Sequence, residues 1–141
     1  MSRNTDLTKY DIPLPDVDER DLKGYWEGTA AGELRVQRTR DGVLQWPPRG
    51  SAVGVPDFDL EWVRVPHTGE LFSWTVVGQT GLQGYSELTP YAVGTVQLDE
   101  VPIRMLGFID EDPATLVAGE RFAAKFITFN DRVTLPIWVR A

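Results

Sequence analysis

The side chains that could perform acid–base or nucleophilic chemistry are few in this chain of 141 residues. It contains no cysteine, which excludes disulfides, thiolate catalysis and cysteine-ligated metal clusters. The single histidine, His67, could act as a general base, but it lies in a Pro-His-Thr-Gly segment that is typical of a solvated turn. We therefore expect neither a Ser/His nor a Cys/His nucleophile arrangement.

Acidic residues form two tight clusters, Asp99-Glu100 and Asp110-Glu111-Asp112. Paired carboxylates can divide acid and base roles or bind a metal ion. Runs of this kind at strand ends are usually solvated, and the spacing identifies no second partner for either cluster. The segment from Gly78 to Gly84 lacks the glycine patterns that hold phosphates at the start of a helix. We predict no catalytic residue.

Five side chains remain as candidates for contacts with a ligand or a partner: Trp46, Arg49, Leu82, Tyr85 and Tyr91. Arg49 could pair with a phosphate group, and Tyr85 could stack on an adenine. In the alternative interpretation, Trp46 packs on the two prolines that follow it and Arg49 pairs with an aspartate of its own chain. Asp57 and Asp59 are the aspartates in reach, and the sequence leaves both interpretations open.

The length and charge of the chain limit what it can be. A chain of 141 residues fits one domain with a small addition. The net charge of −7 argues against an oligonucleotide site, because such sites offer a basic groove to the phosphates. No apolar run is long enough for a membrane span or a signal peptide, and we expect a soluble cytoplasmic protein.

The first third of the chain contains an arm, a helix and a short strand pair. Residues 1–33 are expected to form an extended arm and a helix that starts at Asp18 and ends at Gly32. Residues 34–59 contain two short strands, Leu34 to Arg38 and Val43 to Trp46, joined by an Asp-Gly turn. The core of this segment is expected to consist of five apolar residues: Leu44, Trp46, Val53, Val55 and Phe58.

Residues 60–141 consist of strand after strand without a long helix between them, which is typical of a closed β-barrel. A turn at residues 67–69 is expected to join the first two strands as a hairpin. The predicted strands are Leu60 to Val65, Leu71 to Val77, Tyr91 to Leu98, Ile103 to Ile109, Phe122 to Phe129 and Thr134 to Val139.

Four motifs carry a resemblance to a known family: PPR at 47–49, DLEW at 59–62, PYAVGTVQLDE at 90–100 and VTLP at 133–136. With them the chain resembles the domain of unknown function 35 family, acyl-CoA-associated proteins with a rubredoxin-like zinc ribbon before the barrel. The resemblance implies an all-β fold, a five-stranded Greek-key OB-fold barrel preceded by a helix and a ribbon-like segment.

The zinc ligands of that family are missing from this sequence. The cysteine positions match Thr39, Ala52 and Val55, and the fourth falls in a deletion between Asp41 and Gly42. A structural zinc site needs four thiolate or imidazole ligands. We therefore predict that the ribbon holds no zinc and is stabilised by packing instead.

The resemblance also implies a function. Proteins of the family that this chain resembles are commonly noncatalytic companions of thiolase-superfamily enzymes. These enzymes are lipid-transfer-type thiolases or retro-aldolases of steroid side-chain degradation. The resemblance implies a complex with a partner enzyme that contains two copies of each chain. It also implies an acyl-CoA substrate shared with the partner, and no tightly bound cofactor in this chain. An OB-fold module that binds single-stranded nucleic acid is the alternative.

The longest break between strands, Gly78 to Pro90, is predicted to reach that partner. Loops of this length in compact domains are usually functional or disordered. Leu82 and Tyr85 lie in it among glycines, with few other apolar residues to pack against. We expect both side chains to dock on the partner near its acyl-CoA entrance.

Overall fold

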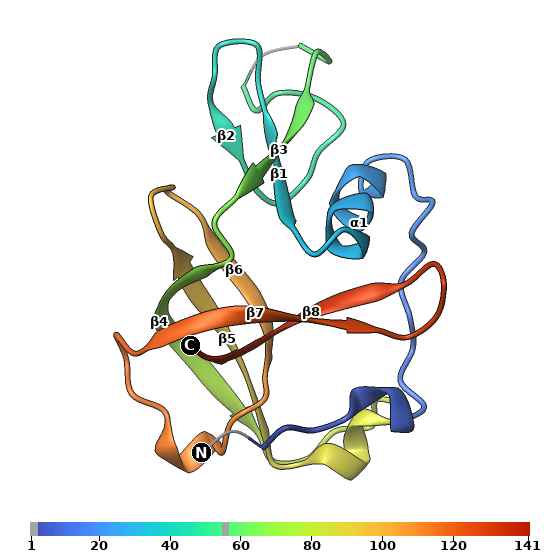
Figure 1. Ribbon diagram of the computed structural model, residues 1–141, viewed down its shortest axis with the longest axis vertical. Helices are drawn as coiled ribbons and strands as arrows, with labels where there is room; N and C mark the ends of the chain where they lie inside the picture. The colour runs from blue at the N-terminus through green and yellow to red at the C-terminus, as the bar shows by residue number, and fades with distance from the viewer. Residues whose placement is uncertain (1–2, 55–56) are drawn as a thin grey trace.

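The computed structural model describes residues 3–54 and 57–141. A small three-stranded sheet stands at one end of a closed five-stranded barrel, and one α-helix lies beside the junction (Figure 1). In chain order the helical elements are η1 (Leu7–Lys9), α1 (Lys23–Ala30), η2 (Tyr85–Leu88) and η3 (Pro113–Thr115), where η marks a 3₁₀ helix. The strands are β1 (Leu34–Arg38), β2 (Leu44–Gln45), β3 (Glu61–Val65), β4 (Thr68–Val77), β5 (Tyr91–Leu98), β6 (Arg104–Ile109), β7 (Arg121–Thr128) and β8 (Thr134–Arg140).

The small sheet, which we call the ribbon sheet, has the strand order β2-β1-β3 with antiparallel pairing throughout. The predicted turn between β1 and β2 is confirmed, and Gly42 adopts the positive φ of 83° that a tight turn requires. The expected hairpin at residues 67–69 is wrong, because β3 pairs with β1 and β4 pairs with β5 and β7. The reason is backbone pairing: β2 pairs with one edge of β1, and β3 provides hydrogen-bond partners for the backbone groups on the other edge.

The barrel closes in the order β4-β5-β6-β8-β7, with one parallel pair between β6 and β8. Along β5 the residues alternate between the inside and the outside of the barrel, as a period of two requires. Gly94 faces inward, where a Cβ would lie 2.6 Å from a backbone oxygen of β4. The interior is filled by large apolar side chains from all five strands: Leu71, Val96, Met105, Ile109, Phe122 and Trp138. The predicted five-stranded OB-fold barrel is thus confirmed.

The helix is shorter than its sequence pattern predicted. It begins at Lys23, and Asp18 does not cap it, since its carboxylate forms an ion pair with Arg132 in the β7–β8 turn. The predicted end is confirmed: Gly32 has a φ of 75°, and the Glu33 amide donates to the Gly28 carbonyl over 2.9 Å.

The N-terminal arm runs along the outer face of the barrel, as Figure 1 shows in blue. Leu7 is buried in an outer cluster with Tyr91, Phe108 and Ile137. The Thr5 amide donates to the buried carboxylate of Asp110 over 2.8 Å. The arm is therefore part of the packed structure. Among the residues that the structure describes, no helix is long and apolar enough to cross a membrane.

Candidate functional site

The acidic cluster at the end of β5 has a structural role. Both oxygens of Asp99 accept bonds from the Arg121 guanidinium, at 2.8 and 2.6 Å, and one also accepts from the Thr68 hydroxyl at 2.7 Å. These hydrogen bonds, the one from Arg121 first, hold the pKa of the Asp99 carboxyl well below its usual range. The pair ties β5 to β7 across β4.

The second acidic cluster is divided among different structural tasks. Glu111 is fully buried and accepts from the Arg140 guanidinium at 3.1 Å and from its backbone amide at 3.2 Å. Glu120 accepts from Arg140 Nε at 2.7 Å, and this bond lowers the pKa of the Glu120 carboxyl. Asp112 caps η3 through the Ala114 amide. Through Arg140, Glu111 and Glu120 bind the end of β8 to the segments around η3, and Asp112 stabilises η3 itself.

His67 is also a structural residue. Its ring meets the Phe126 ring edge-on, with the ring centroids 5.7 Å apart. Its carbonyl accepts from the Ala124 amide over 2.8 Å, which extends the pairing between the start of β4 and β7. Across residues 3–54 and 57–141, no three His, Cys, Asp or Glu side chains gather closely enough to hold a metal ion.

Hydrogen bonds, and not thiolates, organise the ribbon at the two cysteine positions that the structure describes fully. The Thr39 hydroxyl accepts from the Val43 amide at 3.1 Å, and the amide of the buried Ala52 donates to the Asp57 carbonyl at 2.7 Å. Val55 lies outside the described residues. The core expected here is partly wrong: Leu44 and Trp46 pack against the main core, whereas Val53 and Phe58 are exposed, Phe58 to 76%.

Two buried glutamines, missed by the sequence reasoning, hold the ribbon loop instead. Gln37 and Gln45 face each other across β1 and β2, and the Gln45 amide donates to Gln37 Oε1 over 2.9 Å. Gln37 also bonds both backbone groups of Arg49, at 2.6 and 2.8 Å. Gln45 bonds the Ser51 carbonyl and the Val53 amide, each at 3.1 Å. This amide pair fixes residues 49–53 on the sheet, the task that a metal performs in a zinc ribbon.

The signal for this pair was present in the sequence. Gln37 and Gln45 stand at the two positions that a hairpin between 38 and 44 places opposite each other. Polar residues on the inner face of a small hairpin need partners when they are buried. The apolar core expected for this segment gave neither glutamine a role, although both are buried.

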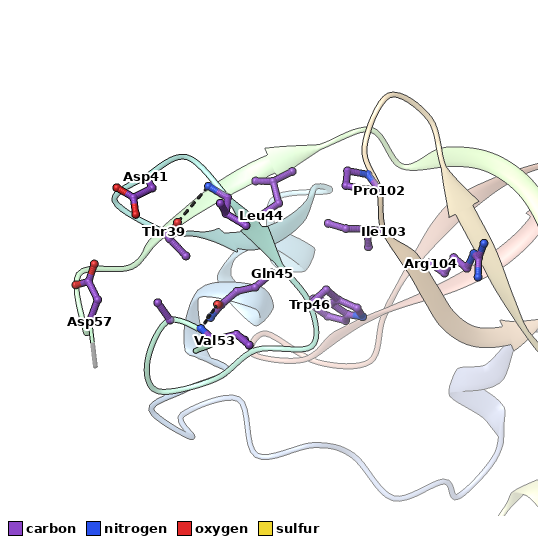
Figure 2. A pocket seen from close by; sticks show the side chains of 12 residues that line it. Thr39, Asp41, Leu44, Gln45, Trp46, Val53, Asp57, Pro102, Ile103 and Arg104 are labelled. Atoms are coloured by element: carbon purple, nitrogen blue, oxygen red, sulfur yellow. Dashed lines mark hydrogen bonds between the residues drawn. The ribbon is translucent and has the colours of Figure 1, made fainter. Parts of the chain in front are cut away.

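A cavity of about 430 Å³ opens between the ribbon and the hairpin that joins β5 and β6 (Figure 2). Its walls include Leu44 and Trp46 from the ribbon and Ile103 from the barrel. Asp41 and Asp57 line its ribbon end. We call this cavity the ribbon groove; its size is within the range of small-molecule and side-chain pockets.

Arg104 lines the barrel end of the ribbon groove. Its guanidinium lies 3.7 Å from the centroid of the Phe72 ring, and its Nε donates to Gln97 Oε1 over 3.1 Å. The stacking on Phe72 is a cation–π contact. Arg104 is thus held in place on the outer face of the barrel.

Of the predicted contact residues, Trp46 lies in the ribbon groove, where its ring is 5.1 Å from that of Tyr25. Arg49 is exposed, and its backbone is bound by Gln37. The alternative interpretation paired Arg49 with Asp57 or Asp59, but in the described part of the chain Arg40 is the residue that approaches these carboxylates, at 3.8 and 3.2 Å.

Tyr85 belongs to η2, which lies at the end of the barrel away from the ribbon sheet, beside the N-terminal arm (yellow in Figure 1), and both Tyr85 and Tyr91 pack in the outer cluster with Leu7 of that arm. Their rings are 5.7 Å apart, and both pack on Phe108. Tyr91 is only 4% exposed, and burial raises the pKa of the Tyr85 hydroxyl. Leu82 is exposed on the loop. The structure therefore does not bring the five predicted residues into one site.

Residues 62–126 match the family model for the C-terminal OB-fold domain of ChsH2. Over 122 residues, 86% of its length, the chain is 33% identical to the 3-oxo-4,17-pregnadiene-20-carboxyl-CoA hydratase alpha subunit of Mycobacterium tuberculosis. The chain covers 38% of that relative. In sequence the chain resembles ChsH2, and it has the OB-fold of the DUF35-type proteins.

Two solved structures share the DUF35-type fold. A chain of the Ltp2-ChsH2(DUF35) aldolase superimposes with a TM-score of 0.76 at 23% identity, covering 89% of this chain and 98% of its own. A DUF35 family protein of unknown function from Sulfolobus solfataricus gives a TM-score of 0.57 at 12% identity, with 87% of each chain covered. The predicted family resemblance is thereby confirmed.

Proposed function

We propose that this DUF35-type protein is a noncatalytic OB-fold subunit of a thiolase-superfamily enzyme, a lipid-transfer-type thiolase or a retro-aldolase. The enzyme would act on acyl-CoA thioesters in steroid side-chain degradation. The observation that carries the proposal is the 33% identity to a steroid-CoA hydratase subunit along 86% of this chain. The fold shared with a chain of the Ltp2-ChsH2(DUF35) aldolase supports it.

The roles of the polar side chains support a noncatalytic subunit. Asp99 and Glu111 are bound by arginines, and His67 packs on an aromatic ring. A general acid or base must be free to reach a reacting proton. These groups stabilise the barrel, so the partner enzyme would supply the catalytic residues and this chain would help to form or cover its CoA site.

The acidic charge of the chain supports a protein partner over the alternative, single-stranded nucleic acid. Its net charge is −7, and two aspartates line the ribbon groove. Phosphate backbones are bound by clusters of lysine and arginine. We infer a complex with two copies of each chain, since a two-fold dimer of the enzyme would offer two equivalent binding surfaces.

The test is reconstitution with the Ltp2-type enzyme of the same organism, purified separately. We expect a stable complex in size-exclusion chromatography with light scattering, with a mass equal to two copies of each chain. This chain alone should cleave no acyl-CoA substrate, and the enzyme should be more active or more stable with it. A monomer that ignores the enzyme, or turnover by this chain alone, would contradict the proposal.

A further inference from the structure

Four large apolar side chains are exposed next to the ribbon groove. Val43 and Val53 lie at its ribbon side, and Phe72 and Leu106 lie on the outer face of the barrel, Leu106 exposed to 67%. Scattered apolar residues are normal on a protein surface, but a contiguous group marks an interaction site. Arg104 lies between the two pairs, since it lines the groove and contacts Phe72.

Arg104 connects the two halves of this surface. It lines the ribbon groove together with Val43 and Val53, and its guanidinium covers the Phe72 ring. Leu106 is two residues further along β6 and therefore on the same face. Val43, Val53 and Arg104 thus line the ribbon groove, and Phe72 and Leu106 lie on the barrel face that Arg104 occupies; we call these five residues the ribbon–barrel surface.

The ribbon groove provides a pocket in the middle of this surface. It is walled by Leu44, Trp46 and Ile103, and its volume of about 430 Å³ can accept a large apolar side chain. Binding energy at protein interfaces is concentrated where an aromatic or aliphatic anchor fills such a pocket. The ribbon–barrel surface therefore has the central pocket that an interface needs.

The charges around the groove select its occupant. Asp41 and Asp57 line the ribbon end, and Asp59 lies nearby. Arg40 is shared between Asp57 and Asp59, which leaves three carboxylates against one guanidinium. The other cation, Arg104, lies at the opposite, barrel end of the groove, where it is stacked on Phe72, so the carboxylates dominate the ribbon end. This arrangement repels phosphates and suits a basic side chain.

We propose that the ribbon–barrel surface is the docking site for the partner enzyme, which places an apolar or aromatic side chain in the ribbon groove and a basic side chain beside Asp41. The inference rests on the proposed function and specifies its interface. It also moves the interface away from residues 78–90, because Tyr85 of that loop packs on its own barrel.

The decisive experiment is a matched pair of charge insertions. Val53→Glu changes the ribbon–barrel surface, and Val117→Glu changes the loop before β7; the two valines are 61% and 60% exposed. Affinity for the separately purified Ltp2-type enzyme is measured by titration calorimetry. We expect Val53→Glu to raise Kd at least tenfold and Val117→Glu to change it less than twofold. Val43→Glu provides a second variant on the same surface.

A charge-reversal pair tests the chemistry of the occupant. Asp41→Lys should raise Kd about tenfold, and the effect should shrink at high salt because a charge contact is involved. Glu87→Lys, an exposed acidic residue on η2, makes the same change in net charge and should have little effect. Equal effects of the two reversals would show that only the overall charge matters, and would overturn the choice of a basic group.

The outcomes separate this inference from the proposed function. If the wild-type chain binds the enzyme and Val53→Glu and Val43→Glu bind equally well, the proposed function stands and the ribbon–barrel surface is wrong. If Leu82→Glu abolishes binding instead, residues 78–90 are the interface. If the wild-type chain does not bind the enzyme, the proposed function fails and this inference with it. Melting temperatures establish that each variant is folded.

Discussion

The amide pair of the ribbon gives the sharpest test of how this segment is held without cysteine ligands. The perturbation is Gln37→Leu, which keeps a similar volume and removes the amide. It deletes the bonds to both backbone groups of Arg49 and to the Gln45 amide. Gln37 is only 3% exposed, so water reaches the site poorly.

The expected loss of stability follows from these three bonds. A buried polar group that loses its partner costs about 1 to 3 kcal/mol. Arg49 is exposed, so water can replace part of the hydrogen bonding that its backbone loses. The Gln45 amide keeps its bond to the Ser51 carbonyl. We expect a net cost of about 2 to 4 kcal/mol. For a chain of this size, that corresponds to a fall in Tm of roughly 8 to 16 °C.

Two measurements and a control make the test specific. Urea unfolding gives the free energy, and hydrogen exchange reports on the Arg49 amide, which should exchange at least tenfold faster in the variant. Gln79→Leu is the control, since Gln79 is exposed on the loop after β4. In the double variant with Gln45→Leu, the cost should be smaller than the sum of the single costs, because the two amides bond each other. An unchanged Tm with unchanged exchange at Arg49 would refute the reasoning.

Three further predictions concern the metal, the acid range and the long loop. Elemental analysis of the purified protein should find no stoichiometric zinc, and a chelator should leave Tm unchanged, because Thr39 and Ala52 carry no metal-binding group. Asp99→Asn should lower Tm at neutral pH, where the wild-type carboxylate is bound by Arg121. Since this bond lowers the pKa of Asp99, its stabilisation is present above the ordinary carboxyl pKa of about 4 and is lost as the pH falls below it. The Tm difference between wild type and variant should therefore narrow from pH 6 to pH 2, and a constant difference would contradict it. Tyr85→Ala should lower Tm because its ring packs on Tyr91 and Phe108, whereas Leu82→Ala should not; equal melting of both variants would place Tyr85 on the surface.

The sequence predicted the local structure of this protein well, for reasons that act within a few residues. The β-branched and aromatic residues of Tyr91–Leu98, bounded by turn signals, identified a barrel strand with its bounds, and glycines marked the turn at Gly42 and the helix end at Gly32. These signals depend on backbone sterics and on the fit of a side chain to an extended strand. The helix start was misplaced because Asp18 binds Arg132, more than a hundred residues away.

The candidate site was accessible to sequence reasoning only in part. Trp46, one of the predicted contact residues, lines the ribbon groove, but its neighbour across the groove, Ile103, comes from the distant β5–β6 hairpin. The exposed positions of Val53 and Phe58 were not foreseen, because the glutamine pair, and not apolar packing, holds their loop. The signal for this pair is the register of the hairpin, which places Gln37 opposite Gln45, and not a hydrophobic period.

The sequence by itself thus determined the strand content, the turn at Gly42 and the absence of cysteine ligands, since each is a property of neighbouring residues or of residue type. Tertiary structure alone decided that β3 joins the ribbon sheet, that Tyr85 faces its own barrel, and that Arg104 links Phe72 to the ribbon groove. The physical reason is that each of these outcomes is a contact between segments far apart in the chain. Such contacts depend on which edges and faces remain unpaired after the local elements have formed.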